Sequence, residues 1–233
     1  MKVSVWRGDA SGSLQTFEVP RFPSQTVLDV VTHIQRHLDP TLAYRYACRV
    51  GMCGSCAMTV NGAPRWTCRT HVDRVAKNEA LEVRPLRNLP VIRDLVTDMR
   101  TFFDKWERAG GHFDGSATKS DDFARIAPDS AERKSIDAGI ECIGCGVCYA
   151  ACDVVKWNPD YLGPAALNRA WTLVADSRDG NEQRLHAIAG DAGCHACHTH
   201  MCCTERCPKH ISPTASIAGL KRAVAKAEIE GKL

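Results

Sequence analysis

The sequence of 233 residues lacks any uninterrupted apolar run of about eighteen residues, so no segment of it is predicted to span a bilayer as a helix. It also lacks runs of like charge, because its 30 basic and 27 acidic residues are dispersed and leave a net charge of only +3. This balance excludes a global electrostatic attraction to nucleic acid, and we expect no nucleic-acid partner. The N-terminus shows no secretory signal pattern. We therefore expect a cytoplasmic protein that does not itself cross a membrane.

Nucleotide-binding fingerprints are missing as well. The sequence contains neither a GxGxxG motif after a predicted strand nor a phosphate-binding P-loop. Aromatic residues make up only 6%, but a hydrophobic share of 44% is enough to build a core. The chain therefore has no evident means of binding a flavin or a nicotinamide, and a partner would have to perform any hydride chemistry.

Cysteine, by contrast, is abundant, with 13 residues in the chain. In a reducing compartment disulfides explain such a number poorly, and an odd count leaves at least one cysteine unpaired. The cysteines fall into three groups, at 48–68, 142–152 and 194–207, and more than seventy cysteine-free residues separate the first group from the second. Metal binding is the better interpretation.

The pattern before the long cysteine-free interval predicts a small sheet crossed by one helix. The helix is expected to begin after Thr26, which forms a capping-box pattern with Asp29, and to end at Asp39-Pro40. Asn61-Gly62 is the residue pair that a type I′ hairpin turn favours. The predicted strands cover 2–7, 14–19, 57–60, 63–67 and 81–84.

After the sheet, apolar residues recur at helical spacing from Val91 to Trp106, which predicts a helix connecting two domains. The following stretch is polar and rich in glycine. Further on, strand patterns are scarce, and prolines at the first turn indicate helices over 164–176 and 213–230. The predicted domains are 1–105, including the connecting helix, and 123–233, with a linker at 106–122.

The first cysteine group has the plant-type spacing for a 2Fe-2S cluster, CxxxxCxxC followed by one more cysteine. Glycines in this loop let backbone amides approach the cluster sulfides. A structural zinc site would also use four thiolates, but it usually has two CxxC-like pairs, and only one pair here has that spacing. The predicted 2Fe-2S ligands are Cys48, Cys53, Cys56 and Cys68.

The second group has the CxxCxxCxxxC spacing of bacterial ferredoxins, in which the fourth cysteine of each run serves the other cluster. The complementary run is CxxHxxCxxxCP, with His200 where the second cysteine would stand. Crossed ligation predicts one 4Fe-4S cluster and one 3Fe-4S cluster. The predicted ligands are Cys142, Cys145, Cys148 and Cys207 for the 4Fe-4S cluster, and Cys152, Cys197 and Cys203 for the 3Fe-4S cluster.

Three residues of the third group are left without a settled role. His200 either fills space at the corner without a cysteine or ligates iron, as histidines do in Rieske centres. Cys194 and Cys202 are explained most simply as small thiols outside the clusters, and either is an alternative ligand.

With these motifs in view, the chain resembles the iron-sulfur subunit of succinate dehydrogenase and fumarate reductase, respiratory complex II. The resemblance runs nearly end to end. It rests on the segments 44–49 (YRYACR), 53–56 (CGSC), 87–95 (RNLPVIRDL), 157–160 (WNPD), 163–166 (GPAA) and 176–179 (DSRD), and on the two later cysteine runs, ending in 207–209 (CPK).

The resemblance implies an α+β chain with an N-terminal β-grasp domain of the plant-type ferredoxin class and a C-terminal all-α domain like a two-cluster bacterial ferredoxin. It implies an electron-transfer subunit of succinate:quinone oxidoreductase, an enzyme complex in which the chain has no catalytic residue of its own. The implied partners are a flavoprotein subunit that carries FAD and a membrane anchor, with haem expected in the anchor. Electrons would pass through the 2Fe-2S, 4Fe-4S and 3Fe-4S clusters in line to quinone, at the cytoplasmic face of the cell membrane.

By position, Trp157 and His198 correspond to the family's quinone-side residues, although a tryptophan there also serves simply to shield a cluster. The chain departs from the family at Asp153, Val154 and Lys156, which leaves the details of the quinone pocket open. Two alternatives remain: the same module serving another flavoprotein, such as a thiol-linked fumarate reductase or a heterodisulfide reductase relative, and a zinc-rich scaffold protein.

Overall fold

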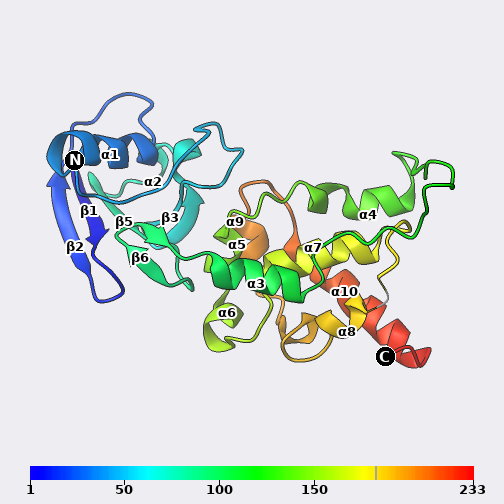
Figure 1. Cartoon of the computed structure of the whole chain (residues 1–233). Coiled ribbons are helices and arrows are strands. Elements are labelled where there is room, and N and C mark those ends of the chain that lie inside the picture. The colour runs from blue at the N-terminus through cyan, green and yellow to red at the C-terminus, as the bar shows by residue number, and fades with distance from the viewer. Residues whose placement is uncertain (182) are drawn as a thin grey trace. The chain divides into compact units, whose positions relative to one another are not determined.

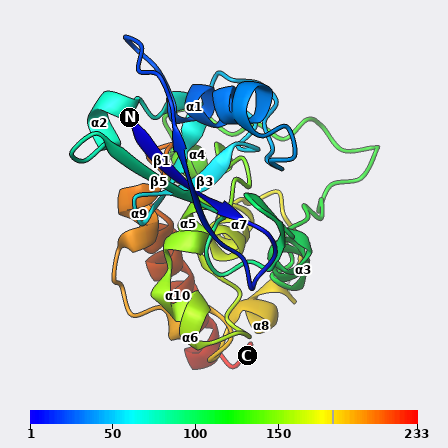
Figure 2. The ribbon, with the colours of Figure 1, turned by 90° about the vertical axis from the view of Figure 1, so that its left-hand side faces the viewer.

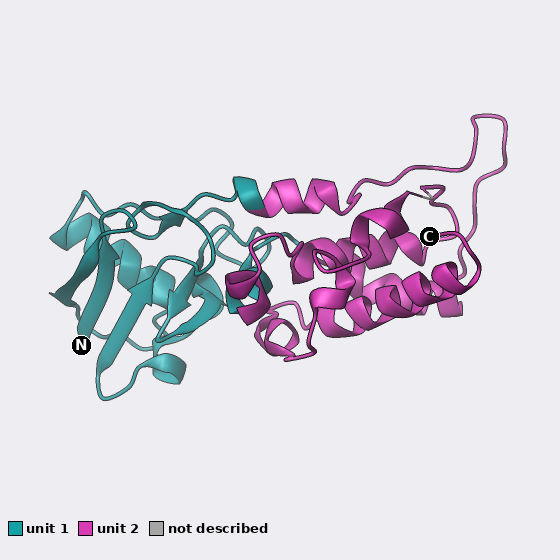
Figure 3. Ribbon diagram, turned by 90° about the horizontal axis from the view of Figure 1, so that it is seen from below, with its two compact units in different colours: residues 1–101, 143–151 teal, residues 102–142, 152–233 magenta. Residues whose placement is uncertain are grey.

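A computed structural model describes residues 1–181 and 183–233, which form two compact units (Figure 1). The first unit comprises Met1–Thr101 together with Ile143–Ala151, and the second comprises Phe102–Cys142 together with Cys152–Leu233 (Figure 3). These bounds differ from the sequence-based domains, because the chain changes unit at Thr101 rather than after a linker. The second cysteine run is also divided, since its middle part belongs to the first unit.

A five-stranded sheet forms the centre of the first unit, with the strand order β2-β1-β5-β3-β4. The two hairpins β1–β2 and β3–β4 are antiparallel, whereas β1 and β5 run parallel. Asn61 and Gly62 both have positive φ, at 46° and 79°, as a type I′ turn requires. The predicted strands are thereby confirmed. Their bounds are β1 Lys2–Arg7, β2 Ser13–Glu18, β3 Ala57–Val60, β4 Ala63–Trp66 and β5 Ala80–Arg84.

Helix α1 (Val27–His33) packs its apolar side against the sheet and continues into a π-helical turn, η1 (Ile34–Leu38) (Figure 2). The predicted capping box is present, because the Thr26 hydroxyl accepts from the Asp29 N–H while the Asp29 carboxylate accepts from the Thr26 N–H. Two short elements, η2 (Thr67–Arg69) and α2 (Val72–Val75), lie between β4 and β5.

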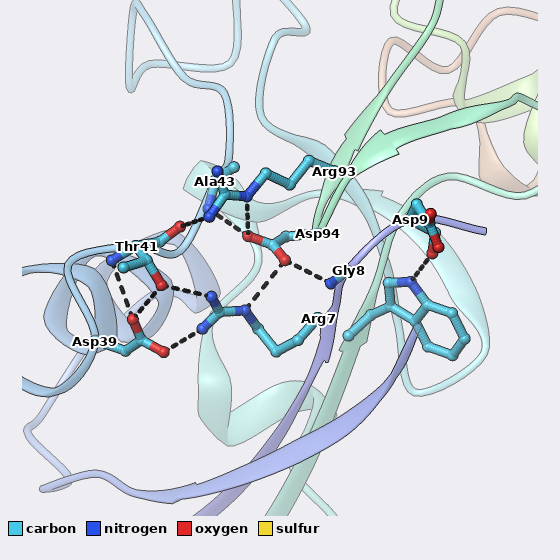
Figure 4. Close-up of polar contacts among 9 residues, drawn as sticks. Arg7, Gly8, Asp9, Asp39, Thr41, Ala43, Arg93 and Asp94 are labelled. Carbon is cyan, nitrogen blue, oxygen red and sulfur yellow. Dashed lines mark hydrogen bonds and ion pairs between the residues drawn. The ribbon is translucent and has the colours of Figure 1, made fainter. Parts of the chain in front are cut away.

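The predicted helix from Val91 to Trp106 is wrong over its first half. The chain there forms the short hairpin β6 (Val91–Arg93) and β7 (Val96–Thr97), and only α3 (Arg100–Arg108) is helical. The reason is Asp94, which adopts a φ of 50° and is nearly buried. Its carboxylate accepts hydrogen bonds from the Gly8 and Ala43 backbone amides at 2.7 and 2.8 Å and from Arg7 at 3.1 Å (Figure 4). These long-range bonds outweigh the local helical periodicity.

The second unit is helical. The predicted helices at 164–176 and 213–230 are confirmed as α7 (Pro164–Val174) and α10 (Pro213–Ile229), each with proline in its first turn. The buried Asn168 joins three helices, because its amide donates to the Gly139 carbonyl at 3.0 Å and its side-chain oxygen accepts from Ser216 at 2.9 Å. The remaining helices are α4 Ala131–Ile140, α6 Asp153–Trp157, α8 Arg184–Ile188, η3 Cys194–Ala196 and α9 Cys202–Arg206; α5 (Val147–Ala151) belongs to the first unit.

Part of the predicted linker is firmly attached to the second unit. Arg184 and Asp179 form an ion pair in which both side chains are almost completely buried. Arg184 also donates to the carbonyls of Gly110 and His112 at 2.9 and 2.7 Å, and Asp179 accepts from the Asp114 amide at 3.0 Å. Because the buried charges of Arg184 and Asp179 are paired and hydrogen-bonded, this network holds the first part of the predicted linker, 106–122, in place. None of the helices in the described ranges has the length and apolar content to cross a membrane.

Candidate iron-sulfur cluster sites

The β3–β4 hairpin brings Cys56 and Cys68 together. Cys56 directly precedes β3 and Cys68 lies in η2 just after β4, so the pairing of Ala57 with Trp66 places the two cysteines at the same end of the hairpin. The Cys56 carbonyl accepts from the Thr67 N–H at 3.3 Å and from its hydroxyl at 2.8 Å. Both cysteines are buried. The register of the β3–β4 hairpin therefore brings two predicted ligands to one end of it.

The other two cysteines of this group lie on the loop between α1 and β3. The Cys48 sulfur accepts from the backbone amides of Met52 and Cys53, each at 3.3 Å, and the Cys48 amide points to the Cys53 sulfur at 3.5 Å. Positive φ values at Arg49 and Gly51, of 60° and 75°, turn the backbone so that these amides face the sulfurs. Such amide donors stabilise the negative charge of thiolates and of a cluster.

The thiols of this group have contrasting proton affinities. Hydrogen bonds from the Cys48 amide and from Ser55 lower the pKa of Cys53 to about 6. Burial, and then the neighbouring Cys56 thiol, raise the pKa of Cys68 to about 12. Iron binds thiolates, so filling the site expels a proton from Cys68 that burial otherwise retains.

The second cysteine group is divided between the units. Cys145 and Cys148 belong to the first unit, where Gly144 and Gly146, with φ of 63° and 76°, flank Cys145. The Asn88 amide donates to the Tyr149 carbonyl at 3.1 Å. These contacts fix the middle of the run beside the sheet of the first unit.

Cys142 and Cys207 lie within the second unit. Cys142 follows α4, and its amide donates to the Gly139 carbonyl at 3.3 Å. Their neighbours form an ion pair, because Lys209 lies 3.2 Å from Glu141. Since Glu141 adjoins Cys142 and Lys209 follows Cys207 by two residues, the pair brings both cysteines into one neighbourhood, as crossed ligation requires.

The three predicted 3Fe-4S ligands, Cys152, Cys197 and Cys203, line one pocket of the second unit. The pocket is partly open to solvent, and the cavity that its lining atoms enclose is about 20 Å³. The buried Cys203 sulfur lies 3.5 Å from the Thr214 hydroxyl. Burial raises the pKa of Cys152 to about 11, and it raises the pKa of Tyr161, a nearly buried wall residue, as well. Burial favours the neutral form of these thiols, so they become thiolates only beside a positive charge. The pocket therefore suits a group that brings positive charge with it, as iron does.

The pocket also shows where the unsettled residues lie. Cys202 and His200 line it, whereas Cys194 is fully buried in η3 and does not. His198 lines the pocket, and its ring lies 6.1 Å from that of His200. The Trp157 ring lies 6.0 Å from the His200 ring, and 64% of Trp157 is exposed. Both predicted quinone-side residues therefore lie near His200, and His198 also lines the pocket.

Sequence reasoning did not single out Lys221. This residue of α10 donates from Nζ to the Cys197 carbonyl at 2.8 Å and so fixes the backbone of a predicted ligand. Its spacing on α10 carries no motif, and only the packing of α10 against η3 reveals the contact.

No three His, Cys, Asp or Glu side chains in the described part of the chain converge on a point that one metal ion could occupy. A tetrahedral zinc ion, with bonds of about 2.3 Å to sulfur, holds all of its ligands around one such point, whereas a cluster distributes its thiolates over several irons.

Comparison with known proteins agrees with this geometry. Residues 2–104 match the family described as a 2Fe-2S iron-sulfur cluster binding domain, and residues 139–211 match a 4Fe-4S dicluster domain. The fumarate reductase iron-sulfur subunit of Escherichia coli O6:H1 is 36% identical over 202 residues, which cover 86% of this chain and 82% of the relative. The chain belongs to the family of fumarate reductase and succinate dehydrogenase iron-sulfur subunits.

Other members of this family extend the match. The fumarate reductase iron-sulfur subunit of Haemophilus influenzae is 33% identical over 220 residues, covering 90% of this chain and 85% of the relative. A chain in the structure of the Mycobacterium smegmatis Sdh1 complex in the apo form is 31% identical, with a TM-score of 0.85, over 98% of this chain and 96% of that one. The predicted fold class is confirmed. The chain is an electron-transfer iron-sulfur subunit of an oxidoreductase complex, with one 2Fe-2S cluster and a dicluster domain for the 4Fe-4S and 3Fe-4S clusters.

Proposed function

We propose that this subunit relays electrons between a flavoprotein subunit, where FAD interconverts succinate and fumarate, and quinone at a membrane anchor. The family membership supports the first half of this relay, because relatives are named as fumarate reductase subunits. The subunit is peripheral to the membrane at its cytoplasmic face, as part of a membrane complex whose anchor carries haem.

We assign the ligands as the cysteine spacing predicts. The 2Fe-2S cluster takes Cys48, Cys53, Cys56 and Cys68, the 4Fe-4S cluster takes Cys142, Cys145, Cys148 and Cys207, and the 3Fe-4S cluster takes Cys152, Cys197 and Cys203. The Lys209–Glu141 ion pair supports the crossed ligand Cys207, and the shared pocket supports the 3Fe-4S set.

The observation that carries the proposed exit to quinone is the rim of the 3Fe-4S pocket. His198 lines this pocket and Trp157 is exposed beside it. An indole N–H donates a hydrogen bond to a quinone oxygen, and an imidazole can deliver the protons that accompany quinone reduction. The 3Fe-4S cluster would then lie next to two side chains that can bind quinone, the acceptor of its electrons.

The test is to purify the subunit from native membranes and to identify the proteins that accompany it. We expect a flavoprotein with bound FAD and a haem-containing anchor. Succinate should reduce all three clusters in this complex, and added quinone should reoxidise them. A preparation without a flavoprotein, or clusters that quinone leaves reduced, would contradict the proposal. Comparing succinate oxidation with quinol-driven fumarate reduction then gives the physiological direction.

A further inference from the structure

Gly54, in the 2Fe-2S loop, lies directly against the second cysteine run. A Cβ atom placed on Gly54 would lie 2.5 Å from the Cβ and 2.9 Å from the Cα of Cys145, and 3.4 Å from Cδ1 of Ile143. Real Cβ atoms essentially never approach other atoms within 3.0 Å. The backbone at Gly54 therefore touches Cys145 with no room for a side chain between them, and both residues belong to the first unit.

Cys145 has little freedom to retreat from this contact. The next element, α5, packs against β4, the strand that leads to Cys68. The Asn88 amide reaches the carbonyls at 149 and 150, and a Cβ on Gly146 would lie 3.2 Å from Met99. Hydrogen bonds and close packing thus fix residues 146–151, and this holds Cys145, which directly precedes them, in place.

We propose that the absence of a side chain at Gly54 sets the separation between the 2Fe-2S and 4Fe-4S clusters, and that the Gly54–Cys145 contact is the bridge for electron transfer between them. Gly54 joins the ligand Cys53 to the turn before the ligand Cys56, and Cys145 is a ligand of the 4Fe-4S cluster. The inference rests on the ligand assignments of the proposed function.

The transfer across this bridge is simple to balance. One electron leaves the reduced 2Fe-2S cluster, which becomes oxidised, and enters the oxidised 4Fe-4S cluster, which becomes reduced. No bond forms or breaks, and no proton moves. Electron tunnelling weakens steeply with separation, so even a displacement of about one bond length slows it, and the fold controls the rate through the position of the two groups.

Two other glycines provide matched controls. Gly62 has a φ of +79°, close to the +73° of Gly54, and a Cβ there would meet nothing within 4 Å. Gly51 lies in the same cluster loop with a φ of +75°, and its Cβ would meet the side chains of Arg69 and Trp66 at 3.0 and 3.1 Å. Alanine at each position carries the same backbone strain. Only Gly54→Ala also forces the two cluster loops apart.

The experiment uses the whole complex purified with each variant, Gly54→Ala, Gly51→Ala and Gly62→Ala. Low-temperature EPR measures the signals of both reduced clusters and the magnetic interaction between them, and rapid reduction kinetics measure electron transfer from the 2Fe-2S to the 4Fe-4S cluster. We expect Gly54→Ala to weaken the magnetic interaction and to slow this transfer several-fold. Gly62→Ala should retain wild-type values, and any effect of Gly51→Ala should be confined to the signal of its own 2Fe-2S cluster.

Each other outcome is also decisive. Loss of the 4Fe-4S signal with an intact 2Fe-2S signal in Gly54→Ala alone supports the contact, because the damage then falls on the distant cysteine run. Wild-type coupling in Gly54→Ala, selective loss of the 2Fe-2S signal, or equal damage in Gly51→Ala overturns the inference, since the glycine then serves only its own loop. If the unmodified complex lacks either cluster, the ligand assignment of the proposed function has failed instead.

Discussion

Replacing Asp94 by alanine should destabilise the first unit more than any exposed charge change in the chain. The carboxylate is 2% exposed and accepts from the amides of Gly8 and Ala43 and from Arg7. It thus connects the end of β1, the segment leading to the cluster loop, and the β6–β7 hairpin (Figure 4). Asp94→Ala leaves two amides without their acceptor and removes one of the two carboxylates paired with Arg7, the other being Asp39.

The magnitude follows from these three lost bonds. Each buried donor left without an acceptor costs about 1 to 3 kcal/mol, and the loss at Arg7 adds less because Asp39 stays paired with it. We therefore expect a loss of about 3 to 5 kcal/mol in the free energy of opening of this unit. Domains of this size are stable by only about 5 to 15 kcal/mol, so the fraction of open molecules should rise at least a hundredfold.

Native-state hydrogen exchange of the cluster-loaded chain, read by mass spectrometry, measures this loss for each segment. Peptides from β1 and β5 should exchange faster in Asp94→Ala, whereas peptides from α10 in the second unit should keep their wild-type protection. Asp73→Ala is the matched control, because Asp73 pairs with Arg21 at the surface with 60% of its side chain exposed. That change should leave the protection of both strands as it is.

Two results would refute the reasoning. A loss below about 1 kcal/mol in β1 would mean that the three donors find other partners or water. An equal loss in α10 would mean that the chain opens as one cooperative body, so the network could not be assigned to the first unit.

Three further predictions follow from the cluster sites. Cys207→Ser should disturb the EPR signal of the reduced 4Fe-4S cluster and Cys152→Ser that of the oxidised 3Fe-4S cluster, and the reverse pattern would contradict crossed ligation. Trp157→Phe and His198→Ala should each weaken quinone binding roughly ten- to a hundredfold. Succinate oxidation with an artificial acceptor that takes electrons directly from the flavin should be unaffected. If quinone-coupled turnover and this artificial-acceptor activity both fall, and the 3Fe-4S signal is lost with them, the two residues only pack against the cluster. A fragment of residues 1–105 should bind a 2Fe-2S cluster after reconstitution with iron and sulfide. Its stability should be reduced, because it lacks the packing of α5 on β4. A colourless product would show that this domain does not assemble the cluster by itself.

Local signals in the sequence predicted much of the first unit. The Asn61-Gly62 turn and the Thr26 capping box act within a few residues, and both are present as expected. The stripe from Val91 to Trp106 misled because Asp94, a residue with no apparent role in that pattern, is fixed by amides more than fifty residues away. Periodicity describes one segment and contains no information about such partners.

At the cluster sites, too, local sequence predicts some features and long-range packing determines others. Cysteine spacing predicted the three ligand sets, and the structure gathers Cys152, Cys197 and Cys203 in one pocket. Spacing could not predict that Cys145 would pack against Gly54, because that contact depends on the chain returning to the first unit after more than forty residues. The role of Lys221 likewise depends on which turn of α10 meets the third cysteine group.

The return of residues 143–151 to the first unit also has a consequence for biosynthesis. The sheet can form once β5 has left the ribosome, but its last packing element appears only after the whole of 102–142 has been made. At about 5 to 20 residues per second, the interval between the end of β5 and the end of the returning segment lasts roughly 3 to 13 seconds. During it, the wall of β4 that α5 later covers is open beside Cys68. The first cysteine group would therefore be most accessible on the nascent chain, before the second cysteine run packs against it.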